Sequence, residues 1–309
     1  MTTAQDVDVI SWRQFRDWAR VENEYQKQII GVHPADHPNA EARGRTYFDI
    51  NVYRYFHAMQ VCWPYLNRPD QKMLDVGSWP GAWLRAVAHF AARHRPRVWA
   101  SGLLFPDDFL QKMDGACHGV QKCELDIWSP MHDREAPNVF TEKDFTFVSA
   151  MEVVEHLYHP GWMFKIIHDA MAPGGILFLT TNNVARLSNV FGLLTGFGTS
   201  NNLGELLPSN GGILGAWRPH AREYCWREIE TIAGKAGFSL LSHGFYQENY
   251  CKPLIASEAM PSEELVYASE DERRFAEKIA PVLAELEQFN FAAKNYDELL
   301  KALAHVEGR

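Results

Sequence analysis

Hydrophobic and polar positions repeat with a helical period in the N-terminal part of this chain. Residues 8–30 and 46–66 place apolar and aromatic side chains at helical spacing. The first run stops at Gly31, and the second stops before a turn-forming segment at residues 67–70. The pattern therefore predicts a helical N-terminal preface over residues 1–70 that packs on the rest of the chain.

After residue 70 the pattern changes, because short apolar runs alternate with amphipathic ones. The apolar runs predict strands at residues 72–76, 97–104, 119–127, 144–150, 176–181 and 239–247. The amphipathic runs predict helices at residues 82–93, 160–171 and 226–238, and Pro160 stands at a favoured first-turn position. This alternation predicts an α/β fold with a doubly wound, mainly parallel sheet as the core, over residues 71–255.

Two segments depart from that alternation. Residues 192–216 are rich in glycine and asparagine, so residues 192–222 are expected to form either a lid over a site or a plain surface loop. Residues 256–309 are acidic, and residues 269–306 show a charge pattern typical of helix. We expect this tail to be an acidic helical C-terminal extension that packs on the core or forms a homodimer contact.

Composition favours an ordinary globular protein. Apolar residues make up 46% of the 309 positions, which allows one domain with additions to bury a full core. No segment has the length and hydropathy of a membrane span or the form of a signal peptide. The five cysteines include no Cys-x-x-Cys pair, so a cytoplasmic location is expected.

Net charge disfavours a nucleic-acid substrate. The chain has 39 acidic and 30 basic residues, for a formal charge of −9, and no basic stripe is visible. Proteins that bind RNA or DNA obtain much of their affinity by neutralising phosphates with lysine and arginine. A small-molecule substrate is therefore expected.

The stretch LDVGSWPGAW, residues 74–83, follows the first predicted strand and is the first candidate site. In an open parallel sheet the ligand lies outside the carboxyl ends of the strands, at this turn. Asp75, Gly77 and Gly81 form the pattern D-x-G-x-x-x-G, whose glycines allow the backbone to approach a ligand closely. The dinucleotide-binding pattern G-x-G-x-x-G is not met.

The order of motifs beyond this turn resembles the class I S-adenosylmethionine-dependent methyltransferases over residues 70–250. The motifs are DVGSWPG, LDI, FVSAMEVVEHLYHP, MAPGGILFLTTNN and HAREYCWREIETIAGKAGF, in that order. They are most similar to the branch that holds the ubiquinone-biosynthesis O-methyltransferases. The resemblance implies a Rossmann-like fold, a methyl-transferring enzyme and S-adenosylmethionine as cofactor.

The same resemblance implies a set of cofactor-binding residues. They are Asp75, Gly77, Ser78, Trp79, Gly81, Ser101, Asp126, Ile127 and Met151. Asp126 matches the residue that meets the adenine amino group, with a strand-end cap as the alternative.

Two positions depart from the family pattern. Trp79 replaces the middle glycine of the loop, as in the similar loop of the rRNA 2′-O-methyltransferases related to the heat-shock enzyme. Ser101 stands near the position where the family has an acid for the ribose hydroxyls. A hydrogen bond to a charged acceptor contributes about 1.5–3 kcal/mol, so the loss of that acid weakens a site without removing it.

Glu152, Glu155 and His156 form the second candidate site. Their spacing places all three on one face if this segment is a helical turn. His156 is a candidate base for an acceptor hydroxyl, since its ordinary pKa is near neutrality. The resemblance to the small-RNA 3′-end 2′-O-methyltransferases, which share E-x-x-E-H, implies instead that Glu152, Glu155, His156 and His220 hold Mg²⁺, Mn²⁺ or Zn²⁺. A structural role, in which Glu155 and His156 cap the next helix, is the third interpretation.

Three arginines, Arg186, Arg218 and Arg222, flank the expected lid and are candidates for gripping an anionic acceptor or for simple solvation. The predicted function is methyl transfer to a hydroxyl oxygen of a sugar, phenol or natural product. Two alternatives stay open: a metal-dependent RNA 3′-end methyltransferase, and a binding protein that has lost catalysis.

Overall fold

The structure is a computed structural model that describes most of the chain. The described residues are 9–36, 42–103, 105–128, 133–196, 220–246, 270–271, 273–278 and 298–305. The expected lid lies mostly outside them. Among the described residues no helix has the length and hydropathy needed to cross a bilayer.

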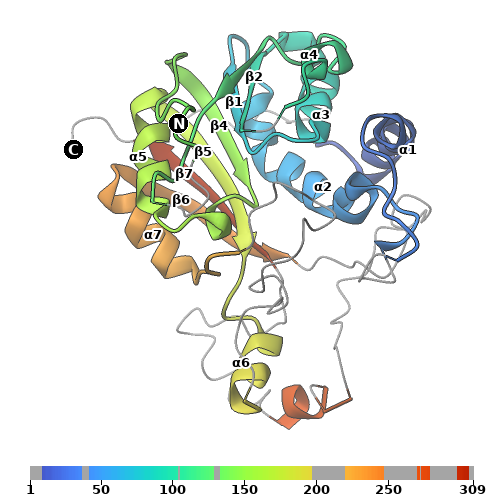
Figure 1. The fold of residues 1–309 in the computed structure, drawn as a ribbon, viewed down its shortest axis with the longest axis vertical. Coiled ribbons are helices and arrows are strands. Elements are labelled where there is room, and N and C mark those ends of the chain that lie inside the picture. Colours follow the sequence, from blue (N-terminus) through green and yellow to red (C-terminus); the bar gives the residue numbers. More distant parts are fainter. Residues whose placement is uncertain are drawn as a thin grey trace.

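A seven-stranded sheet forms the centre of the molecule, in the order β3-β2-β1-β4-β5-β7-β6 (Figure 1). The strands are β1 (Lys72–Val76), β2 (Arg97–Gly102), β3 (Gly119–Lys122), β4 (Phe145–Met151), β5 (Met171–Asn182), β6 (Phe238–Tyr246) and β7 (Glu298–His305). Strands β1 to β5 pair in parallel, and β7 runs antiparallel to both β5 and β6. The predicted α/β fold class is confirmed.

Helices cover both faces of the sheet. They are α1 (Trp12–Ile29), α2 (Tyr47–Leu66), α3 (Ala82–Phe90), α4 (Phe109–Lys112), α5 (Pro160–Ala170), α6 (Leu187–Leu194) and α7 (Trp226–Lys235), with short 3₁₀ helices η2 (Ala92–His94) and η3 (Val154–His156). Figure 1 shows α1, α2 and α3 on one side of the sheet and α5 and α7 on the other. Both halves of the predicted helical preface are confirmed as helices.

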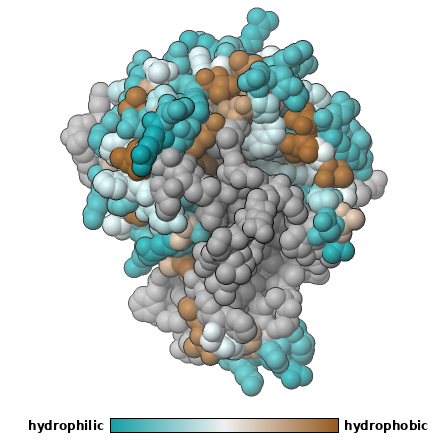
Figure 2. Space-filling view, in the orientation of Figure 1, coloured by the Kyte–Doolittle hydropathy of each residue, from teal (hydrophilic) through white to brown (hydrophobic). Residues whose placement is uncertain are grey.

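Alternation along each strand explains why both faces are buried. Met73, Phe147 and Phe178 point into the core shared with α1 to α3, whereas Leu74 and Val148 point into the core shared with α5 and α7. Successive strand side chains point to opposite faces, so a parallel strand in the middle of such a sheet is apolar throughout. On the outside, apolar residues occur in small groups among hydrophilic ones (Figure 2), as on most globular proteins.

The end of the chain corrects one prediction. Residues 298–305 form strand β7 between β5 and β6, so the expected helix is wrong for this segment, although residues 270–271 and 273–278 are helical. The sequence ELLKALAH has the spacing and the residue types of a helix. Its backbone instead supplies the hydrogen bonds that β5 and β6 need, because tertiary pairing overrides a local propensity.

Two strand boundaries also differ from prediction. Strand β3 ends at Lys122 rather than near residue 127, which leaves Asp126 in the connection that follows. The Pro-Gly-Gly segment at residues 173–175 lies inside β5, at an irregularity in its pairing with β4, rather than between a helix and a strand.

Candidate active site

A polar hollow of about 330 Å³, counting its open mouth, lies at the carboxyl end of β1. Its lining comes from the glycine loop, from β4 and from helices α2 and α3: Tyr47, Arg54, Tyr55, Asp75, Val76, Gly77, Ser78, Trp79, Trp83 and Met151. Five of the predicted cofactor residues therefore share one hollow, and the N-terminal preface contributes three further residues.

The glycine loop is fastened to the end of β2 by its own backbone. The N–H groups of Gly77 and Ser78 both donate to the carbonyl oxygen of Ser101, at 2.8 and 3.1 Å. The Ser101 N–H donates in return to Ser78 Oγ at 3.0 Å. These three bonds hold the loop open above the sheet without using the side chain of Ser101.

Gly77 is required for two separate reasons. Its φ is +75°, in the left-handed region that favours glycine, and a Cβ built on it would lie 2.6 Å from Cγ2 of Val153. Val153 lies two residues after the end of β4 and is the N-cap of η3. The missing side chain thus lets the β1 loop touch the segment that carries the second candidate site.

Trp79 lies at the rim of the hollow. The indole is 38% exposed, and its ring centroid is 6.0 Å from that of Phe109 in α4. An indole that filled the hollow would be buried instead. The tryptophan that replaces the family glycine therefore lines the hollow without filling it.

Asp75 is buried beneath the loop and belongs to a chain of hydrogen bonds. Trp83 Nε1 donates to Ser149 Oγ at 3.0 Å, and Ser149 Oγ donates to Asp75 Oδ1 at 2.6 Å. Burial raises the pKa of Asp75 to about 7, although the hydrogen bond from Ser149 opposes that shift. The carboxyl group at the base of the hollow therefore changes charge near neutral pH.

The structure places the remaining predicted cofactor residues less favourably. Ser101 is fully buried, and so is Asp126, whose carboxylate accepts hydrogen bonds from the backbone N–H groups of Trp128 and Tyr158. Ile127 is half-buried beside it. The occupied carboxylate favours the alternative in which Asp126 ties two loops together, and contact with adenine stays a prediction.

Glu152 stands apart from Glu155 and His156, against the expectation of a shared face. Only residues 154–156 are helical, and Glu152 takes a φ of +53°, which is rare for a residue with a side chain. Thr180 Oγ1 donates to Glu152 at 2.6 Å, while Thr181 Oγ1 donates to Glu155 at 2.9 Å. Since adjacent strand residues point to opposite faces, these two threonines hold the two acids on opposite sides of β5.

Arg54 of α2 is the counter-charge of Glu152, and the sequence interpretation missed it. Its Nη2 lies 3.7 Å from Glu152 Oε2, and its Nε donates to the Tyr246 hydroxyl at 3.1 Å. The sequence did contain a sign of this ion pair, because Arg54 is the single arginine, with no lysine, in a helix of mostly apolar and aromatic residues. A buried charge of that kind requires a partner.

Glu155, His156 and His220 form a compact cluster. One ligand atom from each lies within 4.8 Å of the others, which is a spacing that one metal ion could span. The rings of the two histidines meet edge to face with centroids 4.7 Å apart. Three of the four predicted metal ligands are thus brought together, whereas Glu152 is not part of the group.

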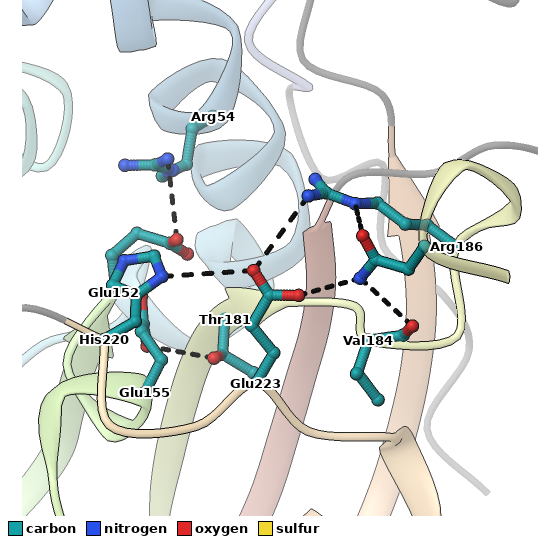
Figure 3. A network of polar contacts seen from close by, with 9 residues as sticks. Arg54, Glu152, Glu155, Thr181, Val184, Arg186, His220 and Glu223 are labelled. Atoms are coloured by element: carbon teal, nitrogen blue, oxygen red, sulfur yellow. Dashed lines mark hydrogen bonds and ion pairs between the residues drawn. The ribbon is translucent and has the colours of Figure 1, made fainter. Parts of the chain in front are cut away.

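The segment that carries His220 is attached to η3 by its backbone. The N–H groups of Ala221 and Arg222 donate to the carbonyl oxygen of Glu155 at 2.7 and 3.1 Å. Figure 3 shows how the side chains gather around this attachment. Two segments far apart in the sequence are therefore held in register at the cluster.

The candidate anion-gripping arginines have internal partners. Arg186 is buried next to Glu223 and Asn189, and the exposed Arg222 pairs with Glu228. Arg218 lies outside the described residues. Internal pairing favours a structural role for Arg186 and Arg222 over a role in holding the acceptor.

Comparison with known proteins assigns the family. Residues 45–243 match the family model described as a methyltransferase domain, so the chain belongs to this family. No curated protein matches the sequence.

Several solved structures match the chain at low sequence identity. One is a chain of the complex between the Haloferax volcanii Trm112 methyltransferase activator and a methyltransferase, with 13% identity, a TM-score of 0.50 and coverage of 84% of this chain and 92% of that one. Another is phosphoethanolamine N-methyltransferase 2 of Haemonchus contortus in complex with S-adenosyl-L-methionine, with 16% identity, a TM-score of 0.46 and coverage of 97% and 61%. A third is a methyltransferase of Archaeoglobus fulgidus, with 15% identity, a TM-score of 0.46 and coverage of 82% and 94%.

The protein is therefore an S-adenosylmethionine-dependent methyltransferase, and the hollow fits the cofactor of its family. The observation that supports the fit is the place of Gly77 in the lining of the hollow, at the turn after β1, where a backbone without a Cβ can approach a ligand closely. Gly81 adds a second bare position, with φ +95° at the start of α3.

We predict that Gly77→Ala weakens binding of S-adenosylhomocysteine at least tenfold, or about 1.4 kcal/mol. The added methyl group forces Val153 away and strains the backbone of the loop. Gly115→Ala is the matched control, because Gly115 has φ +78° but nothing within 4 Å of its Cβ position. Titration calorimetry should show unchanged affinity for S-adenosylhomocysteine in the control. An equal loss of affinity in the two variants would contradict the importance of the close contact between Gly77 and Val153.

We predict that Asp75→Asn removes a pH dependence of stability. The carboxyl group of Asp75 has a pKa near 3.8 in the unfolded chain and a pKa of about 7 in the folded protein. The folded state binds more protons in that window, so its free energy of unfolding falls as pH rises, by about 1.4 kcal/mol per unit. Urea unfolding of the wild type and of Asp75→Asn should be measured from pH 5 to 8. The free energy of unfolding of the wild type, relative to that of the variant, should decline up to about pH 7 and then level off. A constant difference would contradict the assignment.

Proposed function

We propose that the methyl acceptor is a hydroxyl oxygen of a small molecule, such as a sugar, a phenol or a natural product. The cluster of Glu155, His156 and His220 carries the proposal, because an alcohol needs a base or a metal to become a good nucleophile and these side chains offer both. A neutral amine, in contrast, is already a good nucleophile without deprotonation.

The proposed acceptor site lies at the carboxyl ends of β4 and β5. Arg54 lines the hollow and contacts Glu152, and adjacent threonines near the end of β5 bind Glu152 and Glu155, one acid on each side of the strand. The hollow and the cluster are therefore neighbours along one edge of the sheet. When bound in the hollow, S-adenosylmethionine supplies a methyl group on a positively charged sulfur.

The residues of the chain then divide into two groups. Asp75, Gly77, Ser78, Trp79, Gly81 and Met151 hold the cofactor. An imidazole of the cluster accepts the hydroxyl proton as the oxygen gains its methyl group, which leaves the product as a neutral ether.

A divalent metal is the alternative way to activate the hydroxyl. One carboxylate and two imidazoles suit Zn²⁺ or Mn²⁺ and leave positions open for a substrate oxygen. In this role Glu155, His156 and His220 would be the ligands, and Glu152 would not. An RNA 3′ end is a less suitable acceptor because the chain is acidic and lacks a basic stripe.

We expect His156→Ala to lower turnover at least ~100-fold, the usual contribution of a general base, without changing affinity for S-adenosylhomocysteine. The assay uses labelled S-adenosylmethionine with a panel of sugars, phenols and RNA 3′ ends, each with and without a chelator. His94→Ala is the control, since His94 ends η2 next to the start of β2, at the opposite edge of the sheet.

Each outcome separates one alternative. Chelator-sensitive turnover supports the metal, and chelator-resistant turnover supports the free base. Transfer to RNA ends alone would contradict a small-molecule acceptor. A folded protein that gives no heat with S-adenosylhomocysteine would indicate a binding protein without catalysis.

A further inference from the structure

Glu223 is a buried acid that the proposed mechanism does not use. It lies three residues after His220, and its side chain is only 3% exposed. Oε1 lies 3.9 Å from Nδ1 of His220 and 4.0 Å from Nη2 of Arg186, while Oε2 accepts a hydrogen bond from Asn189 at 2.9 Å (Figure 3). A buried carboxylate is costly, so its retention beside the cluster calls for an explanation.

The start of α6 fixes the direction of this carboxylate. Asn189 Nδ2 donates to Glu223 and also to the carbonyl oxygen of Val184 at 3.1 Å. Asn189 Oδ1 accepts from Arg186 Nε at 3.0 Å. Every polar atom of the Asn189 amide is thus committed in one orientation, which presents donors to Oε2 and keeps Oε1 toward His220.

His220 is also restrained from the side of its backbone. The two residues after it donate their N–H groups to the carbonyl oxygen of Glu155, which attaches the backbone next to His220 to η3. With the backbone attached and Nδ1 facing an acid, the ring has one defined orientation. Figure 3 shows the second ring nitrogen, Nε2, on the side turned away from Glu223.

We propose that Glu223 is a positioning residue that holds His220 with its proton on Nδ1 and so leaves the lone pair of Nε2 available to the acceptor. This inference rests on the proposed function, because it makes His220, rather than His156 alone, a proton acceptor or metal ligand. A negative charge on the Nδ1 side stabilises a proton on that nitrogen, whereas a histidine without such a partner favours the proton on Nε2. Arg186 and Asn189 act through Glu223 and connect α6 to the same ring.

The proposal explains a feature that packing alone leaves open. A hydrophobic residue at position 223 would avoid the cost of burying a charge between α6 and the cluster. A carboxylate there orients an imidazole, as the acids behind metal-bound or catalytic histidines do in many enzymes. Both ways of activating the hydroxyl need Nε2 of His220 unprotonated, so the inference holds for either.

The tautomer can be read directly by NMR on the full chain labelled with ¹⁵N-histidine. A long-range proton–nitrogen correlation spectrum shows which ring nitrogen carries the proton, and the His220 signals are those lost in His220→Asn. At a pH where the ring is neutral, we expect Nδ1 protonated and Nε2 unprotonated in the wild type. In Glu223→Gln the amide oxygen stays with Asn189 and the NH₂ group faces Nδ1. The proton of His220 should therefore move to Nε2, so that Nδ1 gives the signal of an unprotonated nitrogen and Nε2 that of a protonated one.

Asp169→Asn is the matched control. Asp169 lies 3.7 Å from Nδ1 of His168 on α5, in a second histidine–carboxylate pair, and its loss should leave the His220 signals unchanged. A wild-type His220 with its proton on Nε2 would overturn the proposal without reference to any variant. A Glu223→Gln protein that keeps the wild-type pattern would also overturn it.

Calorimetry with S-adenosylhomocysteine on the same samples separates this inference from the proposed function. Binding in all variants shows that the fold and the cofactor hollow are intact, so a tautomer result contrary to expectation then counts against Glu223 alone. Absence of binding in the folded wild type counts against methyl transfer, whatever the spectrum of His220 shows.

Discussion

The bare backbone of Gly77 against Val153 is the contact on which the site depends. It brings the loop after β1 to the segment after β4, with only 2.6 Å available where a Cβ would stand. Because Val153 leads directly into η3, the position of the glycine loop also determines where Glu155 and His156 lie. The hollow and the polar cluster are therefore connected through this contact.

Four acids with little solvent exposure lie at this edge of the sheet, and each has a different means of compensation. Asp75 has a raised pKa and a hydroxyl partner, Glu152 has Arg54, Glu155 has Thr181, and Glu223 has Asn189 and Arg186. Placing four carboxyl groups in a poorly solvated region costs stability that an apolar core would not lose. A chain departs from its most stable arrangement mainly at functional sites, so this loss of stability points to function.

The sequence predicted the features that arise from local pattern. Apolar runs located β1 to β6, and D-x-G-x-x-x-G located the hollow, because a parallel sheet puts such turns at its carboxyl edge. The approach of His220 to Glu155 and His156 came from the family resemblance and matches the structure. By contrast, β7 reads locally as a helix and becomes a strand only through pairing with β5 and β6. Glu152 was misplaced because its positive φ turns it to the other side of β5. The sequence interpretation missed the pairing of Arg54 with Glu152, and that of Glu223 with Arg186 and Asn189, because these partners are distant in sequence.

In the proposed complex, one nucleoside ligand occupies the hollow with its sulfur directed along the β4 and β5 edge toward Glu155, His156 and His220. A crystal structure of the protein with S-adenosylhomocysteine shows whether it does. We expect ligand density against the Gly77 loop and beside Met151, with Trp79 still at the rim and the sulfur facing the cluster. An indole of Trp79 found inside the hollow, or a ligand bound with its sulfur facing away from the cluster, would contradict it.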